Sequence, residues 1–500
     1  MRANGVLLAI SSLPSKYGIG CFSKEAFDFI DKLKKAGQHY WQILPLGPTS
    51  YGDSPYQSFS TFAGNPYYID LDEFIEYGWL KDEEVVSIDF GKDNRYVDYE
   101  KQYYNRYKLL KKAYQRSNIS YDKEFLKYIE KEKEWLEDYA LFMALKDAHN
   151  GKQWSLWEDN LRNRDVDAIE QAKIKYSDDI MFHKFLQFEF NRQWLKIKDY
   201  ANSIGIEIIG DIPIYVSYDS SDAWANKELF CFDEKGYPIA VAGCPPDGFS
   251  KTGQLWGNPL YDWDYHNKDN YKWWIKRISK CFELYDVVRI DHFRGFDEYY
   301  TIPYGNKNAI DGKWVKGPNI SLFNAIKKQF PNAKIIAEDL GYVTDSVRKL
   351  VEDTNFPGMK VLEFAFDKRD SSSESDYLPF NYPTNSVVYT GTHDNETIVG
   401  WFNESLDEDE KDIVRNYLGD YTTVDEKINI PLIRLAISSV SDTCIIPMQD
   451  ILGYGNVARM NTPSTTGNNW KWRLLKNEFD SDIIKWLFNL TKIYGRVIVD

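Results

Sequence analysis

Residues 286–293 are DVVRIDHF, a short apolar run that ends in charged and polar side chains. The run is short for a helix, and its valines and isoleucine favour a strand. Side chains alternate between the two faces of a strand, so Arg289 and Asp291 are expected to point the same way. An arginine and an aspartate at the end of an otherwise apolar strand are difficult to explain by packing. The stretch therefore predicts a buried strand with functional groups at its C-terminal end.

Six other short runs lead from apolar or β-branched residues into polar or acidic ones. They lie at 41–46, 206–216, 333–338, 359–364, 387–394 and 444–450, with amphipathic, helix-like segments between them at 24–36, 270–284 and 321–330. Strands that alternate with helices predict a parallel sheet covered on both faces. We therefore expect an α/β fold, a (β/α)8 TIM barrel in which the seven runs are seven of the eight strands and one strand is not recognised. In such a barrel the functional residues lie at the C-terminal ends of the strands. A doubly wound open sheet is the alternative, but no GxGxxG follows the first strand.

Two segments interrupt this alternation. Residues 95–195 are rich in Lys, Glu, Tyr and Leu and favour consecutive helices over 99–116, 121–150 and 168–203. We interpret them as a helical insertion into one barrel that spans residues 1–500. Residues 242–259, AGCPPDGFSKTGQLWGNP, contain seven glycines and prolines, which predict neither a helix nor a central strand. Long loops of this kind often cover binding sites, so we expect a lid-like substrate-binding loop.

The charge balance restricts the partners. The chain of 500 residues carries 76 acidic and 61 basic side chains, a formal net charge of −15. This surplus repels phosphate backbones and anionic lipid surfaces, so we expect no nucleic-acid partner and no membrane partner. The apolar run at 6–10 is far shorter than the roughly 20 residues of a membrane span, and no signal-peptide cleavage site follows it. These patterns predict a cytoplasmic protein.

Cysteine and histidine do not indicate a metal site. The five cysteines are scattered and never form CxxC, and the six histidines show no metal-ligand spacing. The pattern fits a reducing compartment rather than a disulfide framework or a zinc site. We therefore predict no metal and no cofactor.

Three more carboxylates, Asp211, Glu338 and Asp394, lie within the predicted strands or at their ends. Two carboxyls that flank a glycosidic bond can cleave it by double displacement. Like-charged neighbours raise the pKa of the proton donor, whereas an arginine such as Arg289 keeps a nucleophile such as Asp291 ionised. A helix cap or a surface charge explains each carboxylate taken singly. Four of them at strand ends indicate a catalytic site.

Longer segments match one known pattern in order along the whole chain. They are SSLPSKYGIG (11–20), WQILPLGPTSYGDSPYQSFSTFAGNP (41–66), GDIPIYV (210–216), GCPPDGFSKTGQLWGNP (243–259), RIDHFRGF (289–296), AEDLG (337–341), FPGMKVLEFAF (356–366) and TGTHDN (390–395), with ARMNTP and NWKWR near the C-terminus. Through these segments the chain resembles the 4-α-glucanotransferases (amylomaltases or disproportionating enzymes), glycoside hydrolase family 77, which are relatives of the α-amylases.

The resemblance implies a reaction and the residues that perform it. Asp291 is expected to be the nucleophile and Glu338 the general acid/base. Asp394 is expected to be a third carboxylate that grips the hydroxyls of the reacting sugar in the transition state. The implied enzyme cleaves a maltooligosaccharide or another α-1,4-glucan and forms a β-linked glucosyl-enzyme. It then transfers the segment to the 4-hydroxyl of glucose or of a maltooligosaccharide, so that two inversions retain the anomeric configuration.

The resemblance also implies a set of substrate-binding residues. Arg289 and His393 are expected to hold the reacting sugar, and the positions that line the cleft are Ser54, Tyr56, Asp211, Trp256 and Asn461. The positions in the flexible loop over the cleft are Asp247, Phe249 and Ser250. Transfer prevails over hydrolysis only where water is excluded while an acceptor lies close, which gives a lid loop a physical purpose.

Four positions depart from the pattern expected of the family. Tyr300 stands where Trp is usual, Glu363 where Gln is usual, Glu396 where Asp is usual and Ser464 where Gly is usual. None is a catalytic carboxylate, so the departures bear on subsite preference rather than on the reaction. The calcium motif of the α-amylases is replaced by GDIPIYV, and the chain after Asp394 leaves little room for the β-sandwich that those enzymes append. Both points predict a metal-free barrel without a C-terminal β-sandwich.

Three other functions stay open at this stage. A hydrolase of α-glucans on the same fold would accumulate glucose and maltose without longer products. A non-catalytic glucan-binding protein would keep the cleft without the chemistry, but such proteins usually lose one of the three carboxylates. A barrel enzyme for phosphate ligands is disfavoured by the acidic charge and by the lack of a Gly-rich loop that opens a helix.

Overall fold

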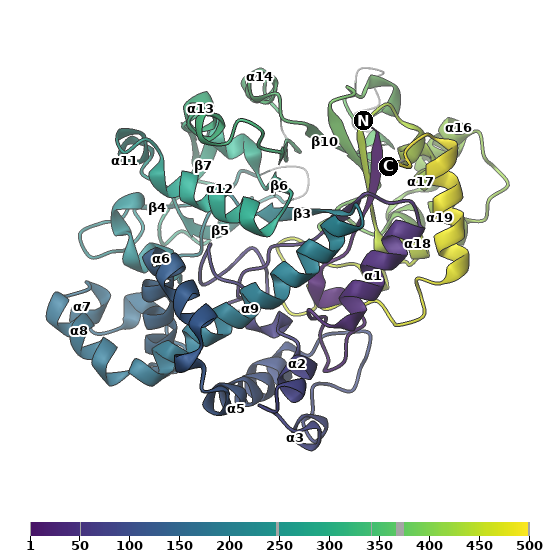
Figure 1. Ribbon diagram of the computed structural model, residues 1–500. Helices are drawn as coiled ribbons and strands as arrows, with labels where there is room; N and C mark the ends of the chain where they lie inside the picture. The colour runs from purple at the N-terminus through teal and green to yellow at the C-terminus, as the bar shows by residue number, and fades with distance from the viewer. Residues whose placement is uncertain (1, 51, 247–249, 342, 367–374, 499–500) are drawn as a thin grey trace.

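The computed structural model describes residues 2–50, 52–246, 250–341, 343–366 and 375–498. Within these ranges eight parallel strands close into a barrel in the order β1–β12–β11–β10–β9–β6–β3–β2 (Figure 1). The strands are β1 (Ala3–Leu7), β2 (Tyr40–Gln42), β3 (Glu207–Ile212), β6 (Val287–Ile290), β9 (Ile335–Ala337), β10 (Gly358–Val361), β11 (Ser386–Tyr389) and β12 (Thr443–Pro447). The predicted (β/α)8 barrel is confirmed, and each of the seven predicted strands overlaps a barrel strand.

Strand β1 is the one that the sequence pattern did not identify. Its sequence, ANGVL, begins with residues that are unfavourable in strands, and Asn4 and Gly5 interrupt the apolar run. All five residues are nevertheless buried, because β1 pairs with both β2 and β12 and closes the barrel. Nδ2 of the buried Asn4 side chain donates a hydrogen bond to the Thr491 hydroxyl at 3.2 Å. The stretch at 6–10, which faintly resembles a signal peptide, is thus the end of a barrel strand and the segment after it.

Helices cover the outside of the barrel (Figure 1). The longer ones outside the insertion are α1 (Lys24–Lys35), α12 (Lys272–Leu284), α13 (Ile320–Gln329), α14 (Asp345–Thr354), α16 (Glu408–Leu418), α17 (Asn429–Ser438) and α19 (Ser481–Ile493). The shorter ones are α2 (Leu71–Glu76), α3 (Asp82–Val86), α10 (Ser221–Ala225), α11 (Trp263–Lys268), α15 (Ile398–Gly400) and α18 (Met448–Leu452). Helices α1, α12 and α13 fall where the amphipathic pattern predicted them, with their apolar side chains buried.

The segment predicted as an insertion lies between β2 and β3 and is helical throughout its regular parts. Its helices are α4 (Tyr99–Lys101), α5 (Tyr107–Ser117), α6 (Lys123–Ala148), α7 (Asp159–Arg162), α8 (Val166–Lys175) and α9 (Ser177–Ser203). The helix predicted over 168–203 is two helices, because α8 ends at Lys175 and α9 begins two residues later. Leu136 and Phe185 belong to the same buried apolar cluster as Trp41 of the barrel. That shared core supports the interpretation as an insertion, and the domain division stays a prediction.

The segment 242–259 contradicts the prediction of a loop without strands. β4 (Ala240–Cys244) and β5 (Gln254–Pro259) form an antiparallel hairpin, which joins β7 (Glu298–Pro303) and β8 (Lys313–Lys316) in a four-stranded sheet of order β5–β4–β7–β8. Gly243 lies in the interior strand β4, where a Cβ atom would lie 2.1 Å from the Gln254 carbonyl oxygen. The glycine permits a close approach at an irregular point of the pairing and does not break the strand.

The barrel strands end earlier than the sequence pattern suggested. β11 ends at Tyr389, so the alternation that placed Asp394 on one face with Thr390 and Thr392 does not apply beyond that residue. β12 ends at Pro447, and helix α18 follows at once. From residue 448 to residue 498 the structure contains helices and irregular segments and no strand. The expected absence of a β-sandwich thus holds for this described part of the chain.

Candidate active site

An arginine joins two of the predicted carboxylates at the end of the barrel. Asp211 of β3 and Arg289 of β6 are partners in the parallel register, and Nη1 of Arg289 lies 2.7 and 2.6 Å from the two Asp211 oxygens. The same nitrogen lies 3.2 Å from Oδ1 of Asp291. Burial opposes the charge of Arg289, but Asp211 and Asp291 hold its pKa well above the ordinary value. Arg289 is therefore a cation, and Asp211 is its fully buried counter-ion.

Asp291 and Glu338 follow neighbouring strands. Ile290 pairs with Ala337 in the β6–β9 register, and the Glu338 amide donates to the Ile290 carbonyl at 3.2 Å, so the two carboxylates leave the sheet side by side. His292 adopts a left-handed backbone conformation (φ 51°) that turns its amide toward Glu338 Oε2, at 2.5 Å. The Leu340 amide donates to the other oxygen at 3.2 Å. The acid that the sequence places at this strand end is thus oriented by two backbone donors.

Burial shifts the pKa of both carboxyls upward. It raises the pKa of Asp291, to about 7, and that of Glu338, and Arg289 opposes both increases. Glu338 also faces the charge of Asp291, which raises its pKa further, to about 8. The Asp291 side chain is 27% exposed and touches the arginine. The arginine contact favours loss of the first proton from Asp291, and the negative charge there opposes ionisation of Glu338, because two close carboxylates do not ionise together easily.

Asp394 lies in a tight turn after β11 rather than in a strand. Its Oδ1 accepts a hydrogen bond from the Asn461 amide at 2.6 Å, and Nε2 of His393 lies 3.4 Å from the same oxygen. Arg459 donates to the Asp394 carbonyl at 2.8 Å and to the Asn461 carbonyl at 2.8 Å. The Asp394 side chain is 46% exposed. One oxygen is thus fixed while the carboxylate stays accessible to a ligand.

Aromatic rings form a wall beside Asp211. The Tyr56 hydroxyl donates to Asp211 at 2.8 Å, and the Tyr56 ring stacks on His393 with centroids 5.0 Å apart and planes at 18°. Trp470 contacts both rings, at 5.8 and 5.9 Å between centroids. Ser54 lies before Tyr56 in the same loop, and its hydroxyl accepts a hydrogen bond from the Tyr56 amide at 3.3 Å. Burial lowers the pKa of His393, so its imidazole is neutral.

The β4–β5 hairpin contacts the residue that follows Asp291. Trp256 of β5 packs edge-on against His292, with ring centroids 4.8 Å apart, and it is partly exposed. Ser250 closes the turn before β5 through its hydroxyl, which donates to the Gly253 carbonyl at 2.8 Å. Asp247 and Phe249 lie outside the described residues. The hairpin therefore places Trp256 next to the residue that follows Asp291.

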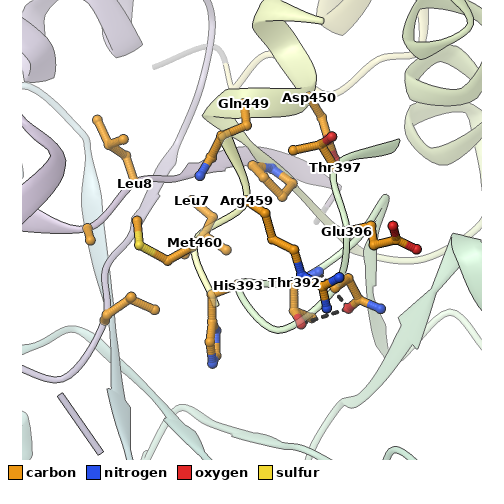
Figure 2. A pocket seen from close by; sticks show the side chains of 14 residues that line it. Leu7, Leu8, Thr392, His393, Glu396, Thr397, Gln449, Asp450, Arg459 and Met460 are labelled. Atoms are coloured by element: carbon orange, nitrogen blue, oxygen red, sulfur yellow. Dashed lines mark hydrogen bonds between the residues drawn. The ribbon is translucent and has the colours of Figure 1, made fainter. Parts of the chain in front are cut away.

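Sequence reasoning missed Arg459, Asn395 and Trp470 as parts of this site. Arg459 lines a pocket together with Thr392 and His393 of the turn that carries Asp394 (Figure 2). The Asn395 side chain accepts hydrogen bonds from the Thr392 amide at 2.9 Å and hydroxyl at 2.8 Å, which close the turn. All three residues fall in the ARMNTP, TGTHDN and NWKWR segments, so a signal for them was present. Their roles depend on contacts across more than 60 residues of chain or within an irregular turn.

Within the part of the chain that the structure describes, His, Cys, Asp and Glu form no group of three or more placed to hold a metal ion. None of the described helices has the length and apolar character to cross a membrane.

Comparison with known proteins agrees with this geometry. The model of the 4-alpha-glucanotransferase family of glycoside hydrolases matches residues 8–477. The chain belongs to this family. A relative named 4-alpha-glucanotransferase, from Clostridium butyricum, is 50% identical over 488 residues, which are 97% of this chain and 99% of the relative. A relative of the same name from Thermus thermophilus is 46% identical over 490 residues, 96% of each chain.

A solved structure resembles the whole chain. It is the amylomaltase from Streptococcus agalactiae in complex with acarbose, with a TM-score of 0.95 and 41% sequence identity, and the match covers 99% of this chain and 100% of that one. The resemblance inferred from the motifs is therefore confirmed at the level of family and fold.

Proposed function

We propose that this member of the family is a 4-α-glucanotransferase that works by a retaining double displacement. The observation that carries the proposal is the pair Asp291 and Glu338 on neighbouring strands, with Arg289 against the first. Neighbouring strands lie about 4.8 Å apart, which suits the carboxyl separation of about 5–5.5 Å in retaining enzymes. Inverting enzymes need about 6.5–9.5 Å, so that a water molecule fits between the carboxyls.

In the first step Asp291 attacks the anomeric carbon of an α-1,4-glucan and forms a β-linked ester. Arg289 favours the ionised form of Asp291, which is the nucleophile. Glu338 holds its proton to about pH 8 and gives it to the oxygen of the departing sugar. Asp394, fixed by Asn461 and accessible on its other side, binds hydroxyls of the sugar as positive charge develops at the anomeric carbon.

In the second step the glucosyl-enzyme passes its sugar to an acceptor. Glu338, now a carboxylate, takes the proton of the acceptor 4-hydroxyl, whose oxygen attacks the anomeric carbon and displaces Asp291. Two inversions give the α configuration again. Water competes with the acceptor for the glucosyl-enzyme. We propose that the β4–β5 hairpin and Trp256 shield the site from water and favour a sugar in the acceptor position.

The substrates follow from this chemistry. We assign maltooligosaccharides and other α-1,4-glucans as donors, and glucose or maltooligosaccharides as acceptors. The partly exposed rings of Tyr56 and Trp256 offer apolar surface for sugars, and Tyr56 is held by stacking on the buried His393. All five cysteines are free thiols, which supports a reducing compartment, and we assign the enzyme to the cytoplasm on that ground.

Incubation of the purified protein with maltotriose, followed by chromatography, tests the proposal. A series of longer maltodextrins together with glucose is the expected result, and Asp291→Asn should abolish it. Asp353→Asn is the matched control, because that side chain is exposed on α14 and forms an ion pair with the exposed Lys349 one turn earlier in its helix. Shorter sugars alone would identify a hydrolase, and no conversion by the natural sequence would contradict the proposal.

A further inference from the structure

One buried carboxyl beside the candidate active site has no role in the mechanism above. Glu363 follows strand β10, and its side chain is almost completely enclosed, with the residue 6% exposed. Its Oε2 accepts one hydrogen bond, from Asn395 Nδ2 at 3.2 Å. Its Oε1 is buried and has no hydrogen-bond partner among the described residues. A carboxylate in that environment would carry an uncompensated charge, which is costly to bury.

The charged groups around Glu363 do not supply that compensation. Asp450 faces it and already accepts hydrogen bonds from the Thr390 hydroxyl at 2.5 Å and the Ile398 amide at 2.8 Å. Glu396 also faces it, and its two oxygens accept from Asn456 and Ser405, both at 2.6 Å.

Arg459 is the cation that faces this group of carboxyls, and its hydrogen bonds go to the carbonyl oxygens of Asp394 and Asn461. Of the three carboxyls, Glu363 therefore has the fewest donors and the least reason to be charged. Burial, with the charges of Asp450 and Glu396, raises the pKa of Glu363 well above its ordinary value.

Glu363 contacts the turn that carries two residues of the candidate site. Asn395 donates to Glu363 and accepts from the Thr392 amide and hydroxyl, and the Asp394 amide donates to the Thr392 hydroxyl at 3.3 Å. The Glu363 amide donates to the Thr390 carbonyl at 3.3 Å. The carboxyl also lies against Gly391, where a Cβ atom would be 2.7 Å from Oε1. One side chain thus touches both ends of the turn.

We propose that Glu363, in its neutral acid form, is a positioning residue that holds the 390–395 turn, and with it His393 and Asp394, in the geometry for transfer. Its role for transfer rests on the proposed function. An amide is isosteric with a carboxylic acid and has no charge, so glutamine should replace Glu363. Glu363→Ala should leave the Asn395 side chain without this acceptor and should loosen the turn. Deprotonation of Glu363 should instead place a negative charge against the backbone at Gly391.

Kinetics separate positioning from general stability. Glu363→Gln is expected to keep kcat and KM within about two-fold at neutral pH, whereas Glu363→Ala should lower kcat by about ten-fold with a smaller change in KM. Asn395→Ala removes the contact with Glu363 and also the two hydrogen bonds from Thr392, so it should lower kcat in either background. Its effect should be smaller in the Glu363→Ala background than in the natural sequence, because the shared contact is already absent there. Glu189→Ala is the control, since that glutamate is equally buried in α9 and pairs with Arg192 away from the site.

Stability against pH tests the proton without any measurement of activity. A raised pKa in the folded state means that the contribution of Glu363 to stability is complete below its unfolded pKa, about 4.3, and is lost as pH rises toward the folded pKa. The Tm of the natural sequence should therefore fall relative to that of Glu363→Gln as pH rises above about 5. The pH dependence of Tm shows whether Glu363 is protonated in the folded protein even if no transfer activity is observed. Failure of the proposed function is therefore distinguishable from failure of the inference.

Two results would overturn the inference. A Tm difference that does not change with pH would show that Glu363 is ionised in the folded protein. A Glu363→Gln variant that loses kcat as severely as Glu363→Ala would show that the turn needs a carboxylate. If Glu363→Ala does not fold, Glu363→Gln alone still decides both points.

Discussion

Nη1 of Arg289 lies 3.2 Å from Oδ1 of Asp291. Arg289 lies in β6 and Asp291 directly follows that strand, and the two side chains meet as the alternation in DVVRIDHF predicted. Asp211 of the neighbouring strand β3 binds the same nitrogen. The arginine therefore lies against a buried counter-ion and the proposed nucleophile at once. We expect its removal to affect folding and catalysis together.

Arg289→Ala should leave Asp211 fully buried without its cation. The expected loss is about 3–5 kcal/mol in the free energy of unfolding, because breaking a buried ion pair strands a charge. Addition of Asp211→Asn should recover part of this stability but none of the transfer activity. Urea denaturation of the two variants and of Asp211→Asn alone measures the coupling. Additive effects of the two substitutions would contradict the assigned pair.

The pH dependence of kcat/KM should have a basic limb near pH 8. In the proposed mechanism Glu338 gives a proton to the departing sugar, and burial and the charge of Asp291 raise its pKa to about 8. We therefore expect activity to be lost as pH rises through that value. With α-maltosyl fluoride as donor, fluoride departs without a proton, so the basic limb of the glycosylation step should vanish. A basic limb that is the same for both donors would assign the ionisation to another group.

Tyr56 has two separable contacts. Tyr56→Phe removes the hydrogen bond to Asp211 and keeps the ring on His393, so we expect a loss of about 1–2 kcal/mol in stability and a modest decrease in kcat/KM. Tyr56→Ala also removes the stacking and should lower kcat/KM for maltotriose much further. Equal kinetic effects of the two substitutions would mean that the ring does not contact substrate.

Ser464 is a departure from the family pattern with a physical cost. Residues 462–465 form a turn in which the Thr465 amide donates to the Thr462 carbonyl at 3.2 Å, and Ser464, after Pro463, has φ 65°. This left-handed position in a turn of type II favours glycine. Ser464→Gly should therefore stabilise the protein by about 0.5–1 kcal/mol, seen as a higher Tm, with transfer unchanged. A lower Tm would show that the serine side chain stabilises the turn.

Activity should not depend on a metal ion. The roles assigned to Asp291, Glu338 and Asp394 require charge and protons from the chain alone. Dialysis against EDTA is expected to leave the rate of maltotriose conversion unchanged. A loss of activity that added calcium restores would contradict the mechanism.

The fold was predictable because a parallel barrel strand is short, buried on both faces and followed by polar residues. The runs that end in Asp291 and Glu338 have this form, and the backbone register then brings the two carboxylates together. β1 was missed because Asn4 and Gly5 dilute its apolar pattern, and its burial depends on partners 35 and more residues away. The local sequence pattern around β1 does not indicate its pairing with β2 and β12.

The less predictable parts of the site are irregular. β11 ends at Tyr389, and the position of Asp394 is fixed by Asn461 and Arg459 rather than by strand alternation. The hairpin that carries Trp256 was hidden by its glycines and prolines, which sequence patterns assign to loops. The family resemblance pointed to these residues, whereas their contacts could be derived only from the folded chain.

The central claim is that Asp291 forms a covalent bond with the transferred sugar. Glu338→Gln lacks the base for the second step, so with α-maltosyl fluoride as donor the maltosyl-enzyme should accumulate. Intact-mass measurement followed by peptide mapping is expected to find one maltosyl group on the peptide that contains Asp291, and none in the Asp291→Asn/Glu338→Gln double variant. A maltosyl group on any other residue, or fluoride release by Glu338→Gln without an adduct, would contradict the account.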